Sequence, residues 1–296
     1  MVKRAVLVGC TYNETRFSLY GCINDVSNMN TLIVQRLGFL QENVKVLTDP
    51  LLPEATIPTG ENIRDALSEM VKSAGAGDVL LFYFSGHGTA IPVYVPGQPY
   101  REEKAIVSCD LDLITRRELR ELIDQLPAGA TLTIVADSSY SGGLATKVKK
   151  QIESNMLIPF PTSYAKLIRK SIDFNIIRQI RSVASYPTND QATGSSFISS
   201  PDDGILLSGC DANETSFDVV LGGGGGRPYG AFTNALLKVL TRNRGESLEN
   251  SRLVYGARKK LMEDGIGVDQ NPCLYCSHDN VNKHFLGGFV EIDQNE

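Results

Sequence analysis

Two short polar segments, each following an apolar run, constrain the fold of this chain more than any other feature. Residues 78–88 read DVLLFYFSGHG, and residues 131–142 read TLTIVADSSYSG. Each apolar run has the length and composition of a buried strand. In an open sheet of parallel strands, the segments that follow the strands meet at the carboxyl edge, where α/β proteins place their functional groups. The sequence therefore predicts that His87 and Ser139 lie at one edge of the same sheet.

The rest of the chain alternates short apolar runs with helix-length segments, which is typical of βαβ units. Thr115 and Glu118 have the spacing of a capping box at the start of a helix. Residues 90–104 contain three prolines and are expected to form a long loop. We therefore expect one α/β domain in which helices flank a mainly parallel sheet. The pattern predicts further strands at 6–8, 44–47, 105–108, 204–208 and 272–275, and helices at 24–36, 63–71, 116–126, 230–240 and 248–262.

The composition limits the possible partners and compartments. The net charge is −5, which argues against a nucleic-acid or acidic-membrane partner. No apolar run approaches the ~18 residues of a membrane span, and the first residues do not resemble a signal peptide. The six cysteines are scattered, as in a cytosolic protein with reduced thiols, and the CxxC pair Cys273 and Cys276 has no second pair to complete a metal site. The sequence thus predicts a cytoplasmic protein with no metal.

The regular alternation stops between residues 145 and 202. This stretch is rich in lysine, arginine and proline, and it ends in a polar run. Because strand and helix patterns resume after it, the stretch interrupts the domain and does not end it. We expect residues 1–144 and 203–296 to form one domain, joined by a basic, irregular linker at 145–202.

The two polar segments carry the groups of an acyl-transfer site. Such a site needs a nucleophile, an imidazole that takes and returns a proton, and N–H donors for the oxyanion. His87 is the candidate base, and the backbone N–H groups of Gly88 and residue 139 are the candidate oxyanion donors. A serine hydroxyl needs a base that a third group orients, and no acidic residue next to His87 in the sequence clearly does this. A turn histidine and a serine that caps a helix are the structural alternatives.

Eight motifs in register resemble the metacaspases, which are caspase-like cysteine peptidases of plants, fungi and protists, and they are most similar to the plant type II group. A histidine about 50 residues before the nucleophile is also the caspase arrangement. The similarity covers nearly the whole chain outside 145–200. The motifs are GCINDV at 21–26, PTGENI at 58–63, YFSGHGT at 83–89, AIVSCD at 105–110, DSSYSGGL at 137–144, GILLSGC at 204–210, YGAFTN at 229–234 and PCLYC at 272–276.

The resemblance implies the three-layer caspase-hemoglobinase fold. Residues 1–144 match the large-subunit region, residues 203–296 match the small-subunit region, and the lysines and arginines of 145–202 are candidate self-cleavage sites. His87 takes the place of the catalytic histidine, and Ser139 occupies the position of the catalytic cysteine.

The resemblance also implies a pocket for an arginine or lysine side chain. Its residues here are Asp25 and Asp137, with Cys22 and Ser85 lining it. Two carboxylates at the bottom of a cleft suit a cationic side chain and repel an acidic one. Taken alone, Asp25 also fits an aspartate in the first turn of a helix, and Asp137 fits a turn residue after a strand.

The chain departs from the family pattern at three places. Ser139 replaces the cysteine, and Tyr140 replaces a histidine. The loop at 91–104 lacks the aspartate cluster that is associated with calcium activation in many type II members, and it offers only Glu102 and Glu103. Calcium takes six to eight oxygen ligands. We therefore expect no required cofactor, and no calcium dependence at this loop.

Three functions remain open from the sequence. The first is a monomeric zymogen of an Arg/Lys-directed cysteine endopeptidase with a Cys-His dyad, which Ser139 renders inactive as written. Its substrates would be basic peptides or proteins, and its role would be in programmed cell death. The second is a pseudo-peptidase that binds basic peptides without cutting them. The third is a serine hydrolase that uses Ser139 and His87, which is the weakest because the chain has no Gly-x-Ser-x-Gly elbow.

Overall fold

A six-stranded sheet forms the centre of the molecule, in the order β12-β9-β7-β3-β1-β2. All neighbouring strands run parallel except β12, which is antiparallel to β9. The prediction of a mainly parallel α/β sheet is therefore confirmed. The computed structural model describes residues 1–49, 56–94, 96–97, 99–144, 165–181, 204–221, 226–243, 246–267 and 269–289. The strands are β1 (Lys3–Gly9), β2 (Val44–Thr48), β3 (Val79–Ser85), β7 (Thr131–Asp137), β9 (Ile205–Ser208) and β12 (Cys273–Cys276).

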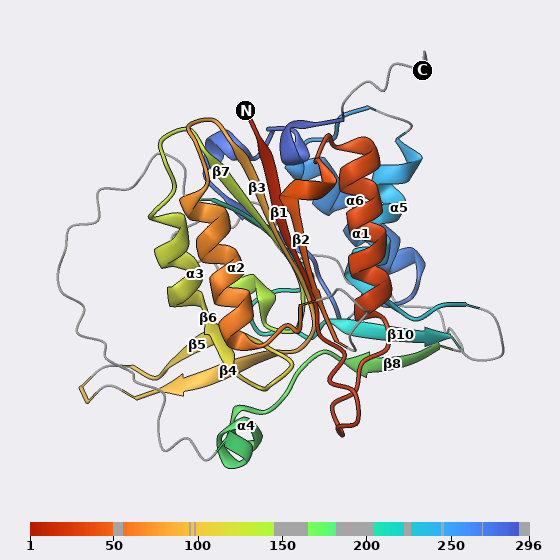
Figure 1. Cartoon of the computed structure of the whole chain (residues 1–296). Helices are drawn as coiled ribbons and strands as arrows, with labels where there is room; N and C mark the ends of the chain where they lie inside the picture. Colours follow the sequence, from red (N-terminus) through yellow and green to blue (C-terminus); the bar gives the residue numbers. More distant parts are fainter. Residues whose placement is uncertain are drawn as a thin grey trace.

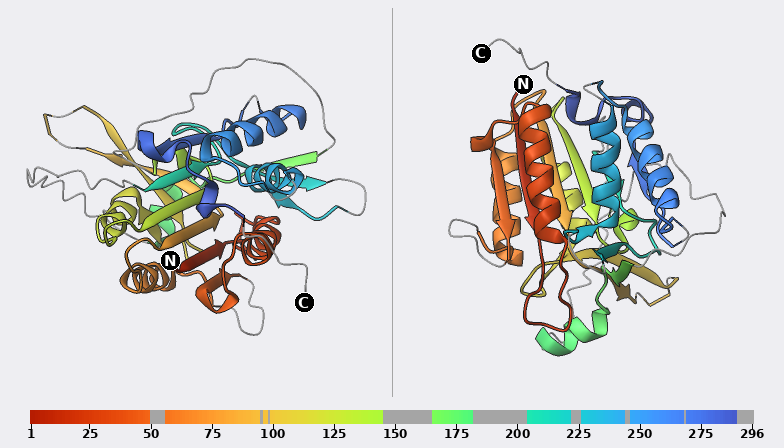
Figure 2. Two further views of the ribbon diagram at one scale, coloured as in Figure 1. Left: turned by 90° about the horizontal axis from the view of Figure 1, so that it is seen from above. Right: turned by 90° about the vertical axis from the view of Figure 1, so that its right-hand side faces the viewer.

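Helices cover both faces of this sheet, which gives three layers (Figures 1 and 2). The two faces carry separate buried apolar clusters. One face is covered by α1 (Cys22–Arg36), α5 (Ala231–Arg242) and α6 (Asn250–Glu263), and the other by α2 (Gly60–Lys72) and α3 (Arg116–Ile123). The capping box before α3 forms as predicted, since the Thr115 hydroxyl accepts the Glu118 N–H and the Glu118 carboxylate accepts the Thr115 N–H. None of the described helices is long and apolar enough to cross a membrane.

The strands β3 and β7 are neighbours at the middle of the sheet. Their continuous apolar sequences are buried because helices cover both faces. Their register places Ser85 opposite Asp137 at the carboxyl edge. The two polar segments that follow these strands, with His87 and Ser139, therefore start side by side.

A small antiparallel sheet at this edge corrects one expectation. Residues 90–104 do not form a long loop, because β4 (Gly88–Val93) pairs with β5 (Arg101–Val107) along its whole length, and β5 pairs with β6 (Leu113–Thr115). Pro92 is accommodated because β4 is the edge strand of this sheet.

A second small sheet includes part of the region expected to be irregular. It has the order β11-β10-β8, with β8 at Ala165–Arg169, β10 at Phe217–Leu221 and β11 at Tyr229–Gly230. Residues 174–181 form helix α4 (Phe174–Arg181). The expectation of irregular structure is thus wrong for residues 165–181, and the candidate cleavage sites at 145–164 and 182–202 lie outside the described residues. Short 3-10 helices cover Gln41–Asn43, Ser141–Gly143, His278–Asn280 and Phe285–Gly287.

The CxxC cysteines cannot share a metal ion. Both lie in β12, where side chains three positions apart point to opposite faces. Cys273 accordingly belongs to the apolar cluster on one side of the sheet and Cys276 to the cluster on the other.

Candidate active site

His87 follows the turn after β3 and is only 2% exposed. Its backbone N–H donates to the Tyr12 hydroxyl at 2.9 Å, and its ring Nε2 lies 2.7 Å from the backbone carbonyl oxygen of Phe17. A carbonyl oxygen can only accept, so Nε2 carries the hydrogen and Nδ1 carries the lone pair of the neutral ring. Nδ1 has no hydrogen-bond partner among the described residues. Nδ1 is therefore the ring nitrogen that can take up a proton.

Burial controls the protonation of His87. Desolvation lowers the pKa of the ring to about 4, and the positive charge of Lys170 acts in the same direction. The Phe17 carbonyl acts in the opposite direction, since it accepts a hydrogen bond from the ring. The imidazole is therefore neutral at pH 7, which is the form that a general base requires.

This pKa shift predicts how stability depends on pH. Because folding lowers the pKa of His87 from 6.5 to about 4, the contribution to stability is fully present above pH 6.5, decreases as the pH falls below 6.5 and is lost by about pH 4. Relative to a His87→Gln variant, we expect the free energy of unfolding to fall by about 2 kcal/mol between pH 7 and pH 5. Urea unfolding of both chains at several pH values measures this, and parallel curves for the two chains would exclude the shift.

Ser139 lies two residues beyond the end of β7 and is 1% exposed. Its hydroxyl accepts the backbone N–H of Ser216 at 3.1 Å. The next residue, Tyr140, has a φ of 61°, which is unusual for a residue with a side chain, and its N–H donates to the Glu214 carbonyl at 3.0 Å. The segment that carries Ser139 is thus held in a strained turn by the loop before β10, and such strain is typical of functional sites.

The backbone N–H groups of Gly88 and Ser139 converge on one oxygen atom. Both donate to the carbonyl oxygen of Lys170, at 2.9 and 3.1 Å. A side chain at position 88 would overlap the Ser139 carbonyl oxygen, so the close approach requires glycine. The carbonyl group of Lys170 is therefore held by the pair of donors that the sequence suggests for an oxyanion.

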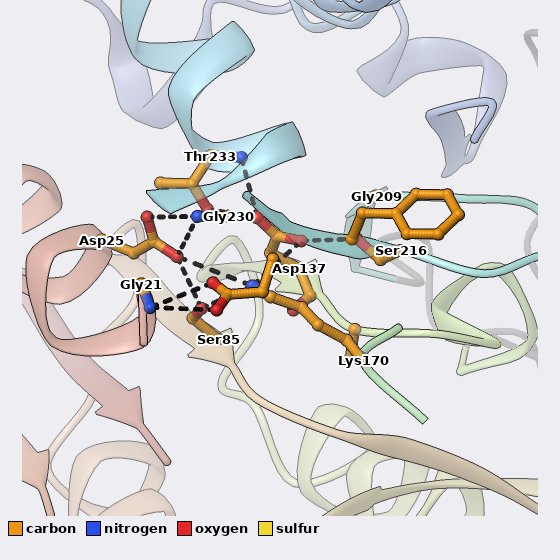
Figure 3. A network of polar contacts seen from close by, with 12 residues as sticks. Gly21, Asp25, Ser85, Asp137, Lys170, Gly209, Ser216, Gly230 and Thr233 are labelled. Atoms are coloured by element: carbon orange, nitrogen blue, oxygen red, sulfur yellow. Dashed lines mark hydrogen bonds and ion pairs between the residues drawn. The ribbon is translucent and has the colours of Figure 1, made fainter. Parts of the chain in front are cut away.

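The side chain of Lys170 is completely buried in an acidic pocket (Figure 3). Its Nζ lies 2.9 Å from the Ser85 hydroxyl, 3.3 Å from Oδ1 of Asp137 and 3.6 Å from Oδ2 of Asp25. It also lies 3.3 Å from the Asp137 carbonyl oxygen. Cys22 is fully buried beside this group, and the charge of Lys170 acts on its pKa, which burial raises well above its ordinary value. The four residues that the sequence assigns to the pocket thus surround one lysine side chain.

Both carboxylates of the pocket are fixed by neutral donors. Asp25, in the first turn of α1, accepts the Gly230 N–H and the Ser85 hydroxyl. Asp137 accepts the Ser216 hydroxyl on one oxygen, and both the N–H and the hydroxyl of Thr233 on the other. These bonds hold the charges in place before any ligand binds, which is the arrangement that favours strong ion pairing in a buried site.

Burial and charge compete in the pocket. The pKa of Asp25 is raised to about 7, mainly by burial and also by the Asp137 carboxylate, although the nearby Lys170 charge lowers it. For Lys170, burial alone would lower the pKa, but Asp137 and Asp25 raise it above its ordinary value. The lysine therefore stays charged at neutral pH.

Three contributors to the site could not be identified from side-chain patterns. Phe17 acts through its backbone carbonyl, which any residue would provide. Ser216 accepts the Lys170 N–H on its carbonyl oxygen at 2.9 Å and holds Ser139 and Asp137 through its other polar groups. Lys170 is one of many basic residues in the linker, and no local signal in the sequence distinguishes it.

Comparisons with known proteins agree with this architecture. The caspase domain model of peptidase family C14 matches residues 2–283. Metacaspase-9 of Arabidopsis thaliana is 41% identical over 97% of this chain and 98% of its own length, and Metacaspase-6 of the same plant is 30% identical over 97% and 100%. The solved structure of protein GSU0716 from Geobacter sulfurreducens matches the fold with a TM-score of 0.66, at 18% identity over 98% of this chain and all of that one. The chain therefore belongs to the metacaspases within the caspase-domain peptidase family.

Proposed function

We propose that this protein has the active site of a type II metacaspase that cuts after arginine or lysine, with Ser139 at the nucleophile position. The observation that carries the proposal is the placement of Lys170. Its N–H is bound by Ser216, its carbonyl oxygen by two N–H donors, and its side chain by the acidic pocket. This is how a peptidase holds the residue before the bond that it cuts.

Each group of the site has a role in the proposed reaction. A nucleophile at position 139 attacks the carbonyl carbon of the basic residue, and the N–H groups of Gly88 and residue 139 stabilise the oxyanion. Nδ1 of His87 takes the proton of the nucleophile and then gives it to the leaving amide nitrogen. The Phe17 carbonyl holds the ring in the tautomer that this transfer needs.

Ser139 accounts for an intact chain with a substrate-like segment in place. A thiol gives up its proton far more readily than a hydroxyl, because its pKa is several units lower, whereas a serine hydroxyl needs an imidazole that a carboxylate orients and stabilises in its protonated form. Here the partner of Nε2 is a neutral carbonyl. We propose that turnover is suppressed in this chain, and the same argument disfavours the serine-hydrolase alternative.

The pseudo-peptidase alternative is less well supported. Its acidic pocket would have to be open to a basic peptide of another protein, but Lys170 of the chain itself fills the pocket and is 0% exposed. An external peptide would first have to displace this lysine. A pocket filled by the chain's own lysine is typical of a zymogen, and we propose that the protein is one. We also propose that it is a cytoplasmic monomer.

The described acidic residues of the loop at 91–104 support the proposal that this loop does not bind calcium. The Glu102 carboxylate is 2.5 Å from the Lys104 ammonium, and the Glu103 carboxylate is 2.6 Å from the Arg116 guanidinium. Both acidic groups are therefore already neutralised by cations, and calcium would need several more carboxylate oxygens. We propose that the reaction needs no metal at this place.

Peptidase assays of a Ser139→Cys variant test the proposal. With fluorogenic peptides that end in arginine, lysine or aspartate, we expect cleavage of the two basic peptides only. The unmodified chain and a Ser139→Cys/His87→Ala variant should be slower by about 10³-fold or more, since each lacks one member of the dyad. A Ser139→Cys variant that is folded but does not cut basic peptides would refute the proposed function.

A further inference from the structure

The chain beyond Lys170 is held by a second set of contacts, separate from the acidic pocket. Ser171 forms a parallel bridge with Gly88, and the Ile172 N–H donates to the Gly88 carbonyl at 3.2 Å. The side chains of Ile172, Phe174 and Ile177 are 2%, 8% and 0% exposed. They belong to the same buried apolar cluster as residues of β4 and β5. Segment 171–181 is therefore anchored by apolar side chains of its own, in addition to the contacts that Lys170 makes in the acidic pocket.

Helix α4 turns one apolar face toward the protein and leaves most of its other residues exposed. The Asp173 carboxylate accepts the Asn175 N–H at 2.7 Å, which fixes the start of α4. Phe174 and Ile177 are three positions apart on the helix and so share one face, while Asn175 is exposed. Helix α4 lies against β4 at the carboxyl edge of the main sheet (Figure 1).

The far end of the segment is held by charge. Nη1 of Arg181 donates to the Asp110 carbonyl at 3.2 Å and lies 3.6 Å from Oδ1 of Asp112. The surface thus offers an apolar region next to the reacting bond and an acidic region at the end of the helix. Complementary charges at such a rim contribute to orientation more than to affinity.

We propose that the surface contacted by segment 171–181 is a second recognition site. It binds the part of a polypeptide that lies on the C-terminal side of the bond to be cut, and it selects apolar side chains at the second, fourth and seventh positions beyond the basic residue. Its occupant in this structure is segment 171–181. The assignment of these positions relative to a cut rests on the proposed function. The apolar contacts of Ile172, Phe174 and Ile177 do not involve the bond between Lys170 and Ser171, so they can keep the segment bound after that bond is broken. A substrate that replaces it must carry the same apolar pattern.

Binding of a labelled peptide with the sequence of residues 171–181 tests the inference without catalysis. The chain with Ser139 in place is compared with an Ile172→Asp/Phe174→Asp/Ile177→Asp variant, in which the buried carboxylates should release the segment. Fluorescence anisotropy should show binding to the triple variant, and binding at least about tenfold weaker to the unmodified chain, whose surface is occupied. The matched control, Asn175→Asp/Gln179→Asp, changes exposed positions and should behave like the unmodified chain.

The peptide supplies the second control. Aspartate at its second and fourth positions should weaken binding by at least about tenfold. Equal binding of both peptides, or a folded triple variant that binds neither, would overturn the inference. If the triple variant does not unfold cooperatively, the Ile172→Ala/Phe174→Ala pair takes its place with the same expected order of affinities. An inactive Ser139→Cys variant would refute the proposed peptidase but would not change this binding result.

Discussion

A Ser139→Cys variant is expected to cut itself between Lys170 and Ser171, so that two fragments replace the 32.3 kDa chain. The reacting carbonyl already lies on the two N–H donors, and the lysine side chain is already in its pocket. The step is therefore intramolecular, and the usual cost of bringing enzyme and substrate together is absent. Gel electrophoresis during expression and after purification follows the loss of the intact chain.

The choice of bond should depend on Lys170. In the Ser139→Cys background, Lys170→Gln removes the charge that the pocket binds, and we expect cleavage at this bond to slow by about 10²-fold or more. Lys166→Gln is the matched control, because Lys166 lies in strand β8, which ends one residue before Lys170, and is exposed. Processing of the Lys170→Gln chain at the parental rate and place would contradict the role of this lysine.

Removing one carboxylate of the pocket should have the second large effect. In the uncut chain, Asp137→Asn leaves the buried Lys170 ammonium with too little negative charge around it. Breaking one side of a buried ion pair typically costs about 3–5 kcal/mol in the free energy of unfolding. In a processed Ser139→Cys background, the same change or Asp25→Asn should slow cleavage after arginine by a factor of about 30 or more.

A double variant separates loss of charge balance from general damage. Lys170→Met removes the cation, so Asp137→Asn should cost much less in a Lys170→Met background than alone. Urea unfolding of the two single variants and the double variant gives this coupling directly. If the cost of Asp137→Asn is the same in both backgrounds, the lysine is not held by that carboxylate.

The sequence was sufficient to predict the centre of the sheet. The apolar runs of β3 and β7 are continuous because both faces of the sheet are covered, and this pattern is strong in a single sequence. Their position as parallel neighbours then brings His87 and Ser139 to one edge. The sequence does not indicate the β4–β5 hairpin, because prolines normally indicate a loop. An edge strand tolerates a proline, although proline has no N–H to donate to a neighbouring strand.

The contacts of segment 165–181 could not be predicted because they are not local. Strand β8 exists through its pairing with β10, about 50 residues further along the chain, and Lys166, Leu167 and Arg169 are exposed. Nothing in this stretch distinguishes Lys170 from its basic neighbours. The Phe17 carbonyl that orients His87 has no sequence signature, since every residue has a backbone carbonyl.

N-terminal sequencing of the fragments of the Ser139→Cys chain tests most directly whether position 139 is the nucleophile of a site that holds Lys170 at the bond to be cut. Because the structure holds the Lys170 carbonyl on the two N–H donors, we expect one new N-terminus, beginning Ser171-Ile172-Asp173. This N-terminus should be absent from the unmodified chain and from the Ser139→Cys/His87→Ala variant. A folded Ser139→Cys chain that stays intact, or whose first cut lies at another residue, would contradict the account.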